Sequence, residues 1–153
     1  MRDAVVAFQA TLLGTALEAL GRFAWGGPYL PELMAQKFFA LIPAWAFTPL
    51  FRTFGYNSKY YTFAGMIAAE VGGLTLIGTV LRGRMRGLPD RRSPWTVVAI
   101  TGAIAVVILV GLFPLLDAGV AGHALTGGIW VTVPTILVVA VCYAALLTRG
   151  MSR

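Results

Sequence analysis

Long apolar runs fill most of the chain and leave few charged positions between them. The runs 60–81, 95–116 and 126–148 contain a single lysine, arginine, aspartate or glutamate, which is Glu70. Each run is long enough to cross a bilayer, which takes about 20 residues. A first run, 4–25, is also long enough, although it is less uniformly apolar. The pattern predicts an all-α integral membrane protein with four transmembrane helices, and the whole of 1–153 forms one membrane domain.

The segment between the first and second spans has a different pattern. Its apolar run 38–51 has only 14 residues and contains Pro43 and Pro49. That length is too short for a helix that crosses the membrane, and proline interrupts helices. We therefore expect 31–54 to form a short interfacial helical hairpin.

Composition and charge placement support a membrane location. The chain is 58% hydrophobic and 12% charged, whereas soluble domains carry about 25% charged residues. Its net charge of +6 comes from basic residues beside apolar runs, which favours anionic lipid over nucleic acid as a partner. With four spans, eight basic residues lie on one side and four on the other, which predicts a cytoplasmic C-terminus. Five of the eight belong to one loop: Arg82, Arg84, Arg86, Arg91 and Arg92.

Small residues recur along the second span. Gly65, Ala69 and Gly73 are spaced four apart, and Gly72 belongs to a parallel series. Small side chains let another helix approach closely in a membrane. We expect this face to meet a helix of this chain or of a partner, with Glu70 beside the contact.

One glutamate in the spans is a candidate for polar chemistry. Glu70 lies near the middle of its span, where an ionised carboxylate is costly, so we expect it protonated and hydrogen-bonded to a threonine or a carbonyl of a neighbouring helix. It serves either as a polar contact between helices or as a proton relay or quinone ligand. In the first span, Glu18 and Arg22 are four residues apart and can pair.

Other chemistry is sparse. His123, the only histidine, lies in a glycine-rich loop and is a candidate ligand for a pigment or shared haem. No intrinsic cofactor is expected, although a quinone or pigment can be shared at a subunit interface. Asp3, Asp90 and Asp117 are isolated at helix ends or in loops. The chain has no Ser-His-Asp set and no metal-ligand spacing, and we expect it not to be an enzyme.

Three segments carry a family resemblance: LPELMAQKFFALIP, FRTFGYNSKYYTFAGMIAAEVGGLTLIGTVL and LFPLLDAGVAGHALTGGIW. Together they resemble the N-terminal membrane region of sulfite-oxidase-like, molybdopterin-dependent oxidoreductases of some bacteria, including filamentous phototrophs. The resemblance covers about 30–147. The chain stops at Arg153 without the molybdopterin domain, so the resemblance implies a membrane module without its catalyst.

These observations predict a non-catalytic membrane anchor or accessory subunit of a bacterial redox or photosynthetic complex. Its partners would be lipids and other integral membrane subunits. One alternative is a subunit that binds quinone, pigment or lipid. Another is a small transporter, which the single intramembrane acid of the second to fourth spans and the lack of an inverted repeat disfavour. An enzyme that acts on a lipid is disfavoured because no nucleophile and base form a set.

Overall fold

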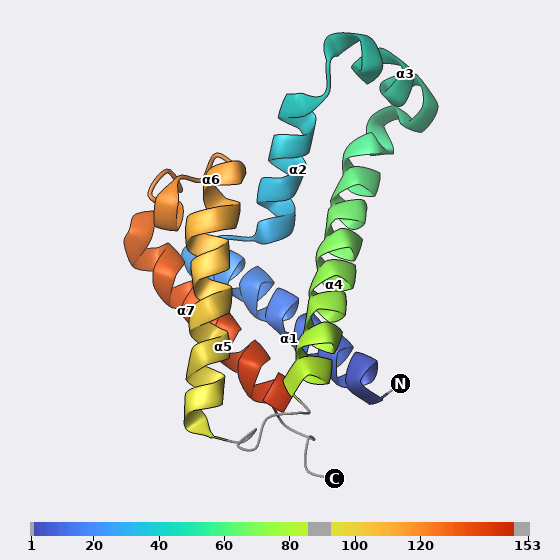
Figure 1. Ribbon diagram of the computed structural model, residues 1–153. Helices are drawn as coiled ribbons and strands as arrows, with labels where there is room; N and C mark the ends of the chain where they lie inside the picture. Colours follow the sequence, from blue (N-terminus) through green and yellow to red (C-terminus); the bar gives the residue numbers. More distant parts are fainter. Residues whose placement is uncertain (1, 86–92, 149–153) are drawn as a thin grey trace.

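A computed structural model describes residues 2–85 and 93–148, and these residues form no strand (Figure 1). Four helices are long and apolar enough to cross a membrane, as expected, and they are compatible with a multi-pass membrane protein. The helical elements are α1 (Arg2–Trp25), α2 (Leu30–Leu41), α3 (Ala44–Phe54), η1 (Gly55–Asn57), α4 (Ser58–Met85), α5 (Pro94–Val106), η2 (Val107–Leu112), α6 (Phe113–Leu115), η3 (Val120–Gly122) and α7 (Gly128–Thr148).

Helix α1 is the central element of the bundle. It packs against both α4 and α7, and these are the two most extensive helix contacts in the chain. Polar contacts run along the α1–α4 boundary: Asp3 with Arg82, Thr11 with Thr75, and Thr15 with Glu70. Residue numbers rise along α1 as they fall along α4, so the two helices are antiparallel.

The packed face of α1 consists of small and polar residues. Its buried positions are Ala7, Ala10, Thr11, Gly14, Thr15, Glu18 and Gly21. Large apolar side chains point outward instead, and Leu20 and Phe23 are 62% and 89% exposed. This distribution is the reverse of a water-soluble helix and is typical of membrane helices, where small residues allow close backbone contact and large ones face lipid.

A second group of buried residues joins α2 to α5, α6 and α7. Leu30 and Leu33 of α2 pack with Ile108, Phe113 and Ile136. Helix α2 therefore stands beside α4 and contributes to the core, whereas the sequence analysis expected the whole hairpin to be interfacial. The chain breaks between α2 and α3 just before Pro43, as expected, and α3 lies at the end of the bundle opposite the start of α1 and the end of α7 (Figure 1).

The third long helix changes its winding before Pro114. Helix α5 continues through η2, a π-helical segment, into α6. Proline cannot donate a backbone hydrogen bond, and its ring crowds the carbonyl four residues earlier. The wider turn of a π-helix relieves that crowding, so the helix passes Pro114 without a break.

Two acids that the sequence analysis treated as isolated are paired. The Lys37 ammonium lies 2.6 Å from an Asp117 carboxylate oxygen and joins α2 to the end of α6. The Arg82 Nε lies 3.2 Å from Asp3 Oδ1, and Arg82 also donates to the Leu147 carbonyl. Asp90 lies outside the described residues.

Arg82 is therefore a buried residue of α4 and not a loop residue exposed to lipid head groups. Its contacts bring together the start of α1 and the ends of α4 and α7. Arg84 is exposed on the last turn of α4. The other three basic residues of the predicted loop, Arg86, Arg91 and Arg92, lie outside the described residues.

The predicted small-residue face of α4 meets no helix within residues 2–85 and 93–148. Gly65, Ala69, Gly72 and Gly73 are all exposed, and an added Cβ at each of the three glycines would have no neighbour within 4 Å. The close approach occurs at Gly78 instead, where a Cβ would lie 2.5 Å from the Tyr143 hydroxyl and 3.0 Å from the Ala7 Cβ.

Gly78→Ala should destabilise the bundle by about 1–3 kcal/mol, because the added methyl overpacks the junction of α1, α4 and α7. It also displaces the Tyr143 hydroxyl, which donates a 2.6 Å hydrogen bond to the Leu74 carbonyl. Thermal unfolding in detergent measures the effect. Gly83→Ala is the control, since this exposed helical glycine has open space around it. Equal stability losses in the two variants would contradict the assignment of Gly78 as the contact point.

Candidate functional site

Two carboxyl groups are buried where α1, α4 and the start of α2 meet. Glu18 is 1% exposed and Glu70 is 6% exposed. The Thr15 hydroxyl donates a 2.9 Å hydrogen bond to Glu70 Oε1, which confirms the expected threonine partner. The Leu30 amide donates to Glu18 Oε2 at 3.3 Å. The two carboxyls are close enough to interact electrostatically.

One buried carboxylate oxygen of this pair has no hydrogen-bond partner among the described residues. Glu70 Oε2 is buried and has no hydrogen bond among the described residues, a property that only Thr101 Oγ1 shares there. No lysine or arginine forms an ion pair with either carboxyl in the described part of the chain. The arrangement thus places two acids in a low-dielectric region without a compensating cation, where both cannot carry charge at low cost.

Glu18 was not predicted to be a site residue, because its spacing of four residues from Arg22 indicated an ion pair. That pairing is wrong: Arg22 forms two hydrogen bonds with Glu32 of α2, at 2.6 and 2.9 Å. The planar guanidinium matches a carboxylate in this two-point geometry, and Glu32 lies at the same exposed end of the bundle. Glu18 belongs to the small and polar face of α1, and that pattern was the signal that could have shown its burial.

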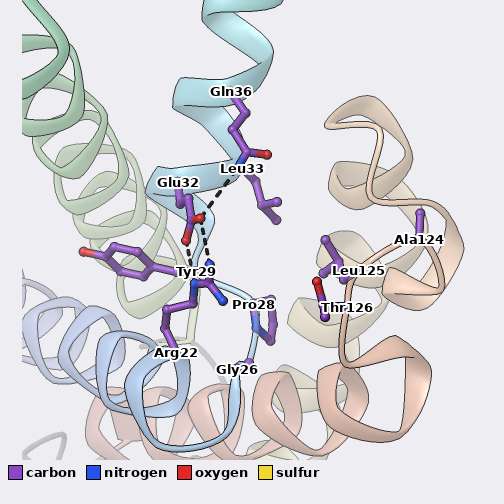
Figure 2. A pocket seen from close by; sticks show the side chains of 11 residues that line it. Arg22, Gly26, Pro28, Tyr29, Glu32, Leu33, Gln36, Ala124, Leu125 and Thr126 are labelled. Carbon is purple, nitrogen blue, oxygen red and sulfur yellow. Dashed lines mark hydrogen bonds and ion pairs between the residues drawn. The ribbon is translucent and has the colours of Figure 1, made fainter.

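A pocket of about 240 Å³ lies beside the Arg22–Glu32 pair, between the end of α1, the start of α2 and the loop before α7. Figure 2 shows Arg22 and Gln36 both directed at Glu32 within it. Its wall also contains Gly26, Gly27, Pro28, Tyr29, Leu33, Ala124, Leu125 and Thr126.

Tyr29 connects this pocket with the buried acids. It lines the pocket, but its ring points away from the Arg22–Glu32 pair and toward α4 (Figure 2). There it packs against the Phe63 ring, with a centroid distance of 5.9 Å. Burial raises the pKa of the Tyr29 phenol above its usual value, and the nearby Glu70 and Glu18 carboxyls raise it further. The phenol therefore shares the electrostatic environment of the acid pair.

The structure does not bring His123 to this site. Its side chain is exposed in the loop between α6 and α7, and its ring covers Gly119, where an added Cβ would lie against the imidazole. Gly119 has a φ of 71°, a conformation that glycine adopts without strain. Within 2–85 and 93–148, no group of three or more potential metal ligands comes together.

Comparison of the chain with protein-family models, curated proteins and solved structures finds no match. The described residues therefore define a broad class only: an all-helical protein in which four helices are long and apolar enough to cross a membrane.

Thr15→Val should destabilise the protein by about 1–3 kcal/mol, because it removes the hydrogen bond to a buried carboxyl and leaves Glu70 without a donor. Thr15→Ser keeps the hydroxyl and should remain close to the wild type. Chemical unfolding of the three proteins in detergent measures the difference. Similar losses in the serine and valine variants would show that the hydrogen bond contributes little.

The raised pKa of Tyr29 predicts a loss of stability in alkali. Below pH 10, the usual pKa, the phenol is neutral in both the folded and the unfolded chain. Above that pH the unfolded chain ionises first, because the folded pKa is higher, so the free energy of unfolding falls. Tyr29→Phe should lose less stability than the wild type between neutral and strongly alkaline pH. Parallel pH profiles of the two proteins would contradict this assignment.

Proposed function

We propose that this protein is a multi-pass membrane subunit that holds another membrane chain against the open face of α4. The observation that carries the proposal is the exposure of that face. Of the four candidate spans, α4 is the least covered, with 11% of its most apolar 18-residue window buried in the chain. Its exposed residues include the evenly spaced Gly65, Ala69 and Gly73.

The proposed partner is another integral membrane helix, because small residues gain little from contact with lipid chains. Close helix approach replaces lipid contacts with dispersion contacts between backbones, which is the common basis of helix association in membranes. The reverse distribution of large and small residues on α1 supports placement of the bundle in a bilayer. The start of α1 and the ends of α4 and α7 meet at one end of the bundle, where Arg82 links the three helices, and this arrangement suits a cytoplasmic face.

The biological setting follows from the sequence resemblance. A membrane region similar to that of sulfite-oxidase-like enzymes fits an anchor or accessory subunit of a bacterial inner-membrane redox or photosynthetic complex. Purification of a tagged chain from its native membrane, followed by mass spectrometry and an absorption spectrum, tests this setting. Co-purifying cytochromes or bacteriochlorophyll proteins would support it, and recovery of the chain with lipid alone would contradict it.

Gly73→Leu should reduce the amount of co-purifying partner at least about tenfold, which corresponds to about 1.4 kcal/mol. The leucine side chain fills the space that a partner helix would occupy. Gly102→Leu is the matched control, since Gly102 is an exposed glycine on α5 with open space around it. Equal recovery of the partner with both variants would show that the α4 face is not the contact surface.

A further inference from the structure

We propose that Glu18 and Glu70 form a proton-binding site inside the bundle, with the proton on Glu70 Oε2 and in exchange with water on the pocket side. This inference rests on the membrane placement proposed above. It adds a ligand, the proton, to a region that the scaffold function does not use.

The carboxylate oxygens of the pair differ in whether they have a hydrogen-bond donor. Glu70 Oε1 accepts from Thr15, and Glu18 Oε2 accepts from the Leu30 amide, so each of these oxygens has a donor. Glu70 Oε2 is buried with none. A bare carboxylate oxygen without a donor is costly in this position, whereas a protonated oxygen becomes a donor itself.

The described side chains around the pair supply no balancing positive charge. Helix α1 contributes Glu18, and its Arg22 is held by Glu32 of α2. Helix α4 contributes Glu70, and the segment before α2 contributes the Tyr29 phenol. The titratable side chains of α7 are Cys142 and Tyr143. The hydroxyl of Tyr143 donates to the Leu74 carbonyl, one turn beyond Glu70. No ion pair in the described residues neutralises either carboxylate, so a proton must supply the missing positive charge.

The proposed route from the pair to water leads through the pocket that Tyr29 lines. Tyr29 lines the 240 Å³ pocket, its ring points toward α4 (Figure 2), and the next residue, Leu30, binds Glu18 through its amide. The pocket and the acid pair are thus joined through two consecutive residues of the chain, Tyr29 and Leu30. Toward the other end of α4, Arg82 joins Asp3 and the Leu147 carbonyl, so the charged groups described there are engaged with each other and not with the acid pair.

Dicyclohexylcarbodiimide is the probe: it is an apolar reagent to which a protonated carboxyl group adds across one C=N bond, and the adduct rearranges to a stable N-acylurea. The full chain is reconstituted in lipid vesicles and labelled at neutral pH, and the adduct is located by peptide mass spectrometry. We expect one adduct per chain, on Glu70. Glu70→Gln should abolish it, while Asp117→Asn, which changes an exposed carboxyl outside the pocket, should leave it unchanged.

Mapping the adduct in the wild type keeps the test valid if Glu70→Gln fails to fold. No adduct in the folded wild type, or an adduct on Glu18 in place of Glu70, would overturn the proposal. An adduct that persists in folded Glu70→Gln protein would also overturn it.

A pH gradient across the vesicle tests the direction of exchange. Vesicles are sorted by the accessibility of a tag at the C-terminus, and the pH is changed on one side at a time. Labelling should fall when the pH is raised on the side away from the tag and should not respond on the tagged side. The reverse dependence would refute the pocket as the route. Recovery of the partner with Glu70→Gln is measured separately, so failure of the proton site and failure of the scaffold proposal are distinguished.

Discussion

The close packing of α1 between α4 and α7 is the contact on which the rest of the structure depends. It uses small side chains, so the helices approach closely at Gly21 and Gly78, where an added Cβ would lie 3.2 and 2.5 Å from the nearest side-chain atoms. In a bilayer no hydrophobic effect drives helices together, and such contacts stabilise the bundle through dispersion and interhelical hydrogen bonds. The polar row from Asp3 to Thr15 adds directional bonds that fix the register of α1 against α4.

This packing also explains why acids can lie inside the bundle. A carboxyl group facing lipid has no partner, but at the α1–α4 boundary Thr15 and the Leu30 amide supply donors. The donor for Glu18 exists only because α2 starts immediately beside it, after the turn at Gly26 and Gly27. The same turn places Arg22 opposite Glu32 and forms the pocket. One tight connection between α1 and α2 therefore positions both the buried pair and the exposed pair.

The sequence was sufficient to predict the helical class and the four long apolar helices, because length and hydropathy alone determine those features. It was also sufficient to predict the break near Pro43 and a threonine partner for Glu70. It was misleading where several residues compete for one partner. Arg22 had Glu18 within one helical turn, but Glu32 is reached only once the chain has folded back. Similarly, the sequence placed Arg82 in a basic loop, whereas folding brings it beside Asp3. The glycine spacing in α4 indicated a contact face, but spacing alone does not tell which chain covers it.

The order of helices along the chain has a consequence for how the protein is made. Helix α1 is synthesised before its neighbours α4 and α7, and α7 includes the last described residue, Thr148. Until α7 is synthesised, the face of α1 that contains Gly14 and Gly21 lacks the helix that packs on it in the structure. Formation of the helices and completion of the bundle are therefore separate events. During the interval Glu18, which is only 1% exposed in the complete bundle, belongs to a helix whose packed face is still open on one side.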